Sequence, residues 1–259
     1  MVWWHAVLIA ATGIWAGMIN TVVGSGTLVT FPTLVALGYP PLTATTSNAI
    51  GLAPGTISGA IGYRHEIRGQ ARRLLTFGIA SFAGALGGTA LLLSLPPDAF
   101  ETVVPGLVGL AVVLVLVQPR VSTWVLSRRE IKEQKGKRTH RSGPLLFFLV
   151  FLVGVYGGYF TAAQGVLLMA IMGMLLSEPI QRLNGIKNVL AAVVNVVAGT
   201  VYAFIAPISW PVVGLLAGGS VLGGLLGARI GRKLSPLVLR IVIVVVGVAA
   251  IVQLIVRQL

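Results

Sequence analysis

The sequence predicts an all-α, polytopic membrane protein in which two halves form an inverted repeat. Of its 259 residues, 56% are hydrophobic and only 10% are charged, and the mean hydropathy is +0.95. A soluble domain carries about 25% charged residues, so the chain is predicted to lie in a lipid bilayer. Two long apolar runs are interrupted at corresponding places in the two halves, and basic residues gather in the loops between apolar runs.

Composition excludes several classes of function. Cysteine is absent, which excludes disulfides, thiolate metal sites and cysteine catalysis. The formal net charge is +13, but the basic residues flank apolar runs as in ordinary membrane proteins, so nucleic acid is not a predicted partner. The three histidines are far apart and there is no phosphate-binding loop, so no metal and no other cofactor is expected. The apolar runs hold no His, Asp or Glu cluster, which predicts that the protein has no catalytic residues and is not an enzyme.

The first apolar run, Val2 to Leu37, is too long for one membrane span and too short for two. A straight helix of this length would measure on the order of 50 Å, whereas the hydrocarbon core is about 30 Å thick. Gly24-Ser25-Gly26 interrupts the run. Backbone that leaves a helix at membrane depth is tolerated only where it is buried in protein or lines a cavity. We therefore expect a helix followed by a short, re-entrant half-helix.

The second half repeats this layout. Pro144 to Leu176 is again too long for one span, and Gln164-Gly165 stands where Ser25-Gly26 stands in the first half. A polar turn, Ser177 to Lys187, follows this run. With the two broken helices, the remaining apolar segments give about eight main spans, three after each break: Ala44–Tyr63, Leu74–Leu95 and Val103–Val117, then Val189–Ala206, Trp210–Ala228 and Val238–Val256. The predicted units are a first transmembrane repeat (1–118), a basic linker (119–143) and a second, inverted repeat (144–259).

The basic loops predict the orientation of the chain. Four loops are rich in Arg and Lys: 64–73, the linker 119–143, 182–187 and 229–233. The positive-inside rule places all four in the cytoplasm, and the number of spans between them agrees only if the run 144–176 enters and leaves on one side. The equivalent loops of the two halves then lie on opposite sides of the membrane. We predict a multi-pass protein of the cell (plasma) membrane, the inner membrane of a bacterium, with both termini outside.

The two breaks are the predicted substrate site. Half-helices that open at Gly26-Thr27 and at Gly165-Val166 would begin near mid-membrane. A helix N-terminus exposes unpaired N–H groups and about half a positive charge, so two such ends facing each other would bind an anion without a dedicated cation. Ser25, Thr27 and Gln164 would add side-chain donors. The alternative is that these glycines serve helix packing alone.

Three further residues are second choices for the same site. Asn48 and Asn188 stand at matched positions after the breaks, and each amide either caps a helix or binds substrate. Lys187 is either a positive-inside anchor at the membrane interface or a cation that reaches an anionic substrate. No acidic residue lies within an apolar run, which argues against cation transport.

Several of these stretches resemble one known family. The Gly24-Ser25-Gly26 break, the run from Ala36 to Asn48, the small-residue helix through Gly59 and the Tyr63-Arg64 pair look like the TauE/SafE family of sulfite exporters. The basic linker and the second copy of the pattern fit as well, so the resemblance extends from about residue 4 to residue 255. It implies transport of small anions, largely sulfur-containing ones such as sulfite, sulfoacetate and other organosulfonates.

The expected function is therefore a secondary transporter of a small, sulfur-containing anion that works by alternating access, with export as the expected direction. An importer or a channel-like path for a sulfur oxyanion is the alternative within this class. A membrane enzyme or a scaffold without transport is the alternative from another class. The expected partners are the anion, the lipid bilayer and a coupling ion, H⁺ or Na⁺, and a homodimer stays open.

Overall fold

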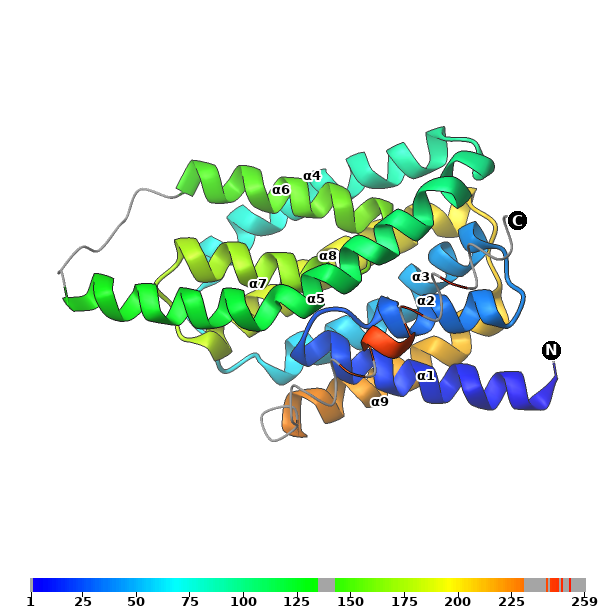
Figure 1. The fold of residues 1–259 in the computed structure, drawn as a ribbon, viewed down its shortest axis with the longest axis horizontal. Coiled ribbons are helices and arrows are strands. Elements are labelled where there is room, and N and C mark those ends of the chain that lie inside the picture. Colours follow the sequence, from blue (N-terminus) through cyan, green and yellow to red (C-terminus); the bar gives the residue numbers. More distant parts are fainter. Residues whose placement is uncertain are drawn as a thin grey trace.

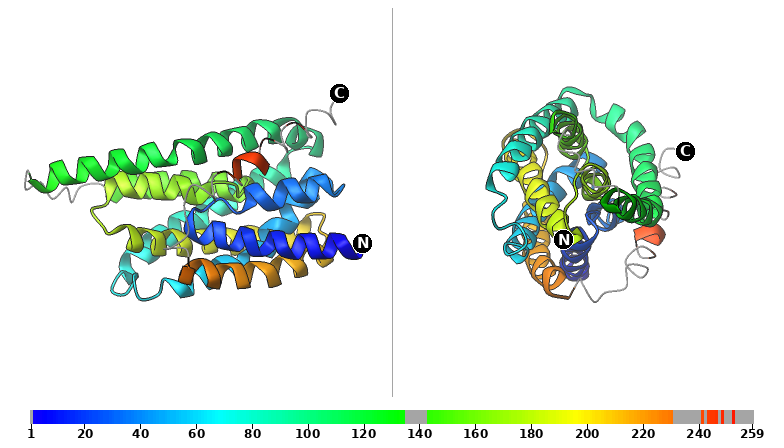
Figure 2. Two further views of the ribbon diagram at one scale, coloured as in Figure 1. Left: turned by 60° about the horizontal axis from the view of Figure 1, so that its bottom comes forward. Right: turned by 90° about the vertical axis from the view of Figure 1, so that its left-hand side faces the viewer.

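The computed structural model describes residues 2–134, 143–230 and seven positions between 241 and 252 (241, 243–246, 248 and 252). These parts are helical, with axes that run roughly along the long axis of the molecule (Figures 1 and 2). The helices are α1 (Trp3–Val22), α2 (Thr27–Ala36), α3 (Pro41–Gly62), α4 (Ala71–Ser94), α5 (Pro97–Gln134), α6 (Gly143–Tyr159), α7 (Gln164–Leu175), α8 (Ile180–Ile205) and α9 (Trp210–Ile230). The all-α prediction is confirmed for the described residues.

Five of the described helices are long and apolar enough to cross a bilayer: α1, α4, residues 98–120 of α5, α8 and residues 210–229 of α9. The shorter apolar helices α2, α6 and α7 flank the two breaks. The basic linker was predicted for 119–143, and α5 continues as a helix through Gln134 while 135–142 lie outside the described residues. The basic turn at 232–233 and most of the predicted last span, Val238–Val256, also lie outside them.

The first apolar run is broken where the sequence predicts, and the second is broken directly before the predicted Gln164-Gly165 pair, which already belongs to α7. α1 and α2 are separated by residues 23–26, and α6 and α7 by residues 160–163. α1 begins at the end of the bundle that carries the N-terminus, and α6 begins at the opposite end (Figure 1). α2 and α7 then return toward the end from which their partner helix came, so each pair is a re-entrant hairpin.

The helices that precede the two breaks, α1 and α6, pack closely on helices from the other half of the chain. α1 lies along α9 and α4 lies along α6, and α3 packs on α8. A Cβ atom added to Gly17 of α1 would lie 2.9 Å from Cα of Ser220 in α9, and one added to Gly84 of α4 would lie 2.9 Å from Cα of Gly154 in α6. Small residues allow this approach of backbones in lipid, where packing rather than the hydrophobic effect holds helices together.

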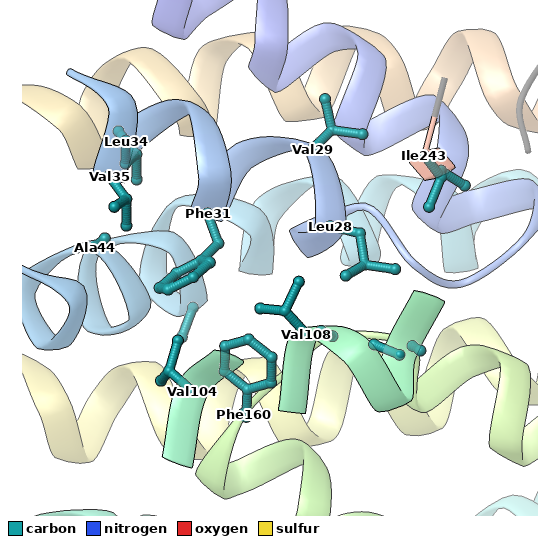
Figure 3. Close-up of a cluster of buried hydrophobic side chains, with 14 of the residues drawn as sticks. Leu28, Val29, Phe31, Leu34, Val35, Ala44, Val104, Val108, Phe160 and Ile243 are labelled. Atoms are coloured by element: carbon teal, nitrogen blue, oxygen red, sulfur yellow. The ribbon is translucent and has the colours of Figure 1, made fainter. Parts of the chain in front are cut away.

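The first half-helix contributes to a hydrophobic core that the second break completes. Phe31 of α2 meets Phe160, a residue of the second break, with ring centroids 5.3 Å apart and ring planes nearly perpendicular. Val104 and Val108 of α5 pack beside these rings (Figure 3). Edge-to-face pairs of this kind stabilise a core by about 1 kcal/mol beyond their buried area. The core thus fixes the backbone of the second break against the first half-helix.

Candidate functional site

The two breaks are in direct backbone contact. The amide of Gly165 donates a hydrogen bond to the carbonyl oxygen of Gly24, with 3.1 Å between nitrogen and oxygen. A Cβ atom added to Gly24 would lie 2.5 Å from Cα of Gly165, and one added to Gly165 would lie 2.5 Å from Cα of Gly24. Side-chain-free residues are therefore required at both positions for the breaks to cross.

Each break contains one residue in the left-handed region, at the position just before the predicted site residues. Gly24 has φ +91° and Ala163 has φ +57°. Glycine adopts this conformation readily, whereas alanine does so at a cost of about 1–2 kcal/mol. The sequence contains a signal for the first turn, a glycine, but none for the second, because Ala163 is an ordinary helix former.

Two predicted site residues carry buried polar groups that find no hydrogen-bond partner among the described residues. The hydroxyl of Ser25 is fully buried, and the side chain of Gln164, whose two polar atoms are both unpaired, is 2% exposed. Gln164 lies against Gly157 of α6, where the absence of a side chain leaves room for its amide. A buried polar group without a partner costs about 1–3 kcal/mol, so such groups call for an explanation.

A hydrogen-bonded network of hydroxyl and amide groups lies beside the crossing. The hydroxyls of Thr27 and Thr161 are 2.9 Å apart, and the Asn48 amide donates to Thr27 at 3.0 Å and to Thr161 at 3.4 Å. Thr30 donates to the Asn48 carbonyl oxygen. Thr27 and Asn48 were expected at the site, whereas Thr30 and Thr161 were missed. Their only signal in the sequence is a hydroxyl within one turn of a break.

Lys187 lies inside the protein and not at its surface. The sequence predicts a polar turn up to this residue, and this is wrong, because α8 already begins at Ile180 and carries Lys187 into the bundle. The side chain is 0% exposed, which rules out an anchor at the membrane interface. Its ammonium group donates to the backbone oxygens of Asn20 at 3.2 Å and Thr21 at 2.9 Å.

The neighbouring amide of Asn188 reaches the same helix end. Its nitrogen donates to the backbone oxygen of Thr21 at 3.3 Å. Asn20 and Thr21 belong to the last turn of α1, whose carbonyl groups have no partner within the helix and carry the negative end of its dipole. Neither asparagine caps its own helix, since Asn48 and Asn188 lie inside α3 and α8.

The N-terminal ends of both half-helices lie at the crossing. α2 begins at Thr27 and α7 at Gln164, and neither N-terminus has a side-chain cap. The N-terminal ends of both half-helices, with their positive partial charge, therefore lie next to the breaks. The crossing combines these ends with the unpaired Ser25 and Gln164 and with the ammonium of Lys187 at the end of α1. This is a chemistry suited to an anion.

At one end of the bundle, an ion-pair cluster joins the connection before α8 to α4. Glu178 accepts from Arg73 and from Arg182, each at 2.7 Å. Burial raises the pKa of the Glu178 carboxyl, but hydrogen bonds and charges from the two arginines outweigh it and hold the pKa below its ordinary value. Arg73 also lines an open cavity of about 520 Å³ at the start of α4. Among the described residues, no group of three His, Cys, Asp or Glu side chains could hold a metal ion.

Comparison with known proteins gives consistent matches. The profile of the family described as "Sulfite exporter TauE/SafE" matches residues 9–254. The chain is 25% identical to the probable membrane transporter protein ORF9 of a Sinorhizobium species, over 92% of this chain and 88% of that protein. It is 23% identical to a probable membrane transporter protein of Haemophilus influenzae, over 83% and 81%, and 26% identical to YfcA of Escherichia coli K12, over 58% and 52%. No solved structure matches the chain significantly.

Proposed function

Because the chain belongs to the sulfite exporter TauE/SafE family of membrane transporters, and not to a family of enzymes, we propose that it is a secondary transporter of a small sulfur-containing anion. The proposed substrates are sulfite, sulfoacetate or another organosulfonate. The proposed site is the crossing of the two breaks, with Ser25, Gly26, Thr27, Gln164 and Gly165 in contact with the anion. Asn48, Lys187 and Asn188 would complete its surroundings.

The observation that carries this proposal is the pair of unpaired polar side chains at the crossing. Ser25 and Gln164 stand at corresponding positions of the two halves and are buried, and their side-chain polar groups find no partner in the part of the chain that the structure describes. Both can donate to an oxyanion, and the N-terminal ends of α2 and α7 add a positive potential. Intramembrane half-helix ends that face a substrate are the arrangement by which broken-helix transporters hold anionic groups.

Alternating access between two inverted halves is the proposed mechanism. In an inverted repeat, α1 of the first half corresponds to α6 of the second, and α4 corresponds to α9. The packing of α1 on α9 then has its counterpart in the packing of α6 on α4, and both are present. Because α3 corresponds to α8, the packing of α3 on α9 likewise has its counterpart in the packing of α8 on α4. The contact between α3 and α8 is its own counterpart. This agreement supports an inverted repeat, in which rocking of one half against the other opens the site to each side in turn.

The proposed topology follows from the placement of the basic residues. The α3–α4 connection with Arg64 and Arg68, the α7–α8 connection, and the end of α9 lie at one end of the bundle, opposite the N-terminus (Figure 1). We place this end in the cytoplasm, in keeping with the positive-inside rule. Export is the proposed direction, and uptake or a channel-like path is the competing one.

Counterflow of labelled sulfite in proteoliposomes tests the proposal, with sulfate, thiosulfate and sulfoacetate as competitors. Saturable exchange that small sulfur anions inhibit is the expected result. Folded protein that exchanges none of these anions would overturn the substrate class.

Two single substitutions test the location of the site. Ser25→Ala removes a hydroxyl with no described partner, so folding should not suffer, while a lost hydrogen bond to an anion lowers affinity about 10–100-fold. Ser220→Ala is the matched control, because its hydroxyl donates to the Gly51 carbonyl oxygen at 2.8 Å and is used by the fold. The control should lower the melting temperature and leave the KM for the anion unchanged. A Ser25→Ala variant with an unchanged KM, or a Ser220→Ala variant with a raised KM, would place the site elsewhere.

A further inference from the structure

Lys187 is buried, and none of the described acidic side chains pairs with it. Its side chain is 0% exposed, and among the described residues no ion pair includes it. The six acidic residues of the chain all lie outside the apolar runs: Glu66, Asp98, Glu101, Glu130, Glu133 and Glu178. A charge buried without a partner is destabilising by several kcal/mol, so such a lysine either binds an anion or gives up its proton.

Among the described residues, no titratable side chain bonds to the ammonium group of Lys187. α8 packs against α1, α3, α4, α6 and α7. The titratable or charged side chains on these elements and on α8 itself, with the residue that ends α3, are His5, Tyr63, Arg72, Arg73, Tyr156, Tyr159, Arg182 and Tyr202. In the described part of the chain none of them bonds to Lys187, whose partners are two backbone oxygens.

Those two oxygens have a specific meaning in a broken-helix transporter. Asn20 and Thr21 form the last turn of α1, directly before the first break. Carbonyl groups at the C-terminus of a helix that is broken inside the membrane are where Na⁺-coupled carriers hold their sodium ion. Here the ammonium of Lys187 occupies them at 2.9 and 3.2 Å. The ammonium group of Lys187 thus occupies the position that a coupling Na⁺ would take. A lysine side chain cannot leave the site, but it can release and take up a proton.

On the basis of the proposed function, we infer that Lys187 couples transport of the anion to H⁺, with one proton moving alongside each anion. With the anion bound, Lys187 is an ammonium that balances the anion's charge and keeps one N–H free to donate to it. When the anion leaves, the ammonium transfers a proton to water on the same side and returns as a neutral amine. On the other side water supplies the next proton together with the next anion. The net movement is one anion and one H⁺ in the same direction, so that an inward pH gradient drives uptake and an internal excess of anion drives export.

The experiment uses the full-length protein in proteoliposomes whose membrane potential is held at zero by potassium and valinomycin. A labelled organosulfonate with a single charge, methanesulfonate, is the probe because it does not titrate and cannot itself carry a proton, and an enclosed pH dye reports proton entry. With acid outside, the wild type should accumulate the anion, with protons entering at a ratio near one and with no requirement for Na⁺. Accumulation that ignores the pH gradient, or that needs Na⁺, would overturn the inference.

Two variants assign the proton to Lys187. Lys187→Arg keeps a cation that does not release its proton, so whatever counterflow of anion for anion remains should carry no H⁺, and accumulation driven by the pH gradient should fall to background. Lys187→Gln removes the charge and should lose both. Arg68→Gln, an exposed loop residue, is the control and should behave as wild type. If either Lys187 variant retains the wild-type proton ratio, Lys187 is not the coupling group.

The inference and the proposed function fail in different ways. A wild-type protein that exchanges no sulfur anion in counterflow removes the function and the inference together. A wild-type protein that exchanges anions but moves no protons with them leaves the function in place and removes only the role of Lys187. If Lys187→Arg does not fold, the test rests on the number of protons that enter with each anion in the wild type and in Lys187→Gln. A carrier that depends on Lys187 cannot keep the wild-type number of protons per anion in the glutamine variant.

Discussion

The amide of Gly165 hydrogen-bonds to the carbonyl oxygen of Gly24 at 3.1 Å, across 140 intervening positions of sequence and between the two halves of the chain. Two half-helices cross at this point, and their backbones approach so closely that neither position accommodates a side chain. The contact explains why helix breaks that are costly in a membrane are retained, since each break satisfies part of the other's backbone.

Gly24→Ala should destabilise the protein strongly. The new Cβ would lie 2.5 Å from Gly165 Cα, in addition to the strain of an alanine at φ +91°. Gly38→Ala is the matched control, because Gly38 has φ +93° with nothing within 4 Å of the added atom, so only the strain of about 1–2 kcal/mol applies. Thermal unfolding in detergent compares the two. Equal losses of stability would mean that the breaks do not touch.

Ala163→Gly should stabilise the protein. The substitution relieves an alanine at φ +57°, and the greater freedom of glycine in the unfolded chain offsets part of the gain, which leaves up to about 1 kcal/mol. The melting temperature should rise while counterflow stays unchanged. A lower melting temperature would show that this residue does not adopt the left-handed conformation.

Thr161→Val should cost about 1–2 kcal/mol, because Thr27 and Asn48 both lose a partner across the two halves. Thr33→Val is the control, since that hydroxyl donates to the Val29 carbonyl oxygen of its own helix at 2.8 Å and makes no other hydrogen bond to a described residue. It should cost only a few tenths of a kcal/mol. If the two variants unfold at the same temperature, the network between the halves contributes nothing.

Glu178→Gln should lower stability near neutral pH by at most about 1 kcal/mol, because its ion pairs are partly exposed to solvent. The folded-state pKa of the carboxyl lies below its unfolded value of 4.5, so its stabilising contribution is present above that value and is lost as pH falls through the folded pKa. The difference in melting temperature between wild type and variant should therefore shrink below about pH 4. A difference that grows in acid would contradict the ion-pair geometry.

The two breaks could be predicted because they are local events. Small and polar residues inside an apolar run signal a chain that leaves the helix, and Gly24 and Gln164 stand in such places. Ala163 and Thr161 could not be recognised, since an alanine or a threonine in an apolar segment is compatible with an ordinary helix. Lys187 was misplaced for a related reason. The polar residues before it are typical of a loop, yet α8 begins at Ile180 because packing in the bundle outweighs local polarity.

The sequence by itself determined that the chain is a helical membrane protein, that its two halves share a layout, and that each long apolar run is broken. The length of an apolar run and the local backbone preference depend only on residues close in sequence, so both can be predicted from the sequence. The tertiary structure alone decided that Gly24 meets Gly165, that Asn48 joins Thr27 to Thr161, and that Lys187 sits on the end of α1. Gly165, Thr161 and Lys187 lie more than 100 residues from their partners in the first half, and only the packing of helices from opposite halves brings them together.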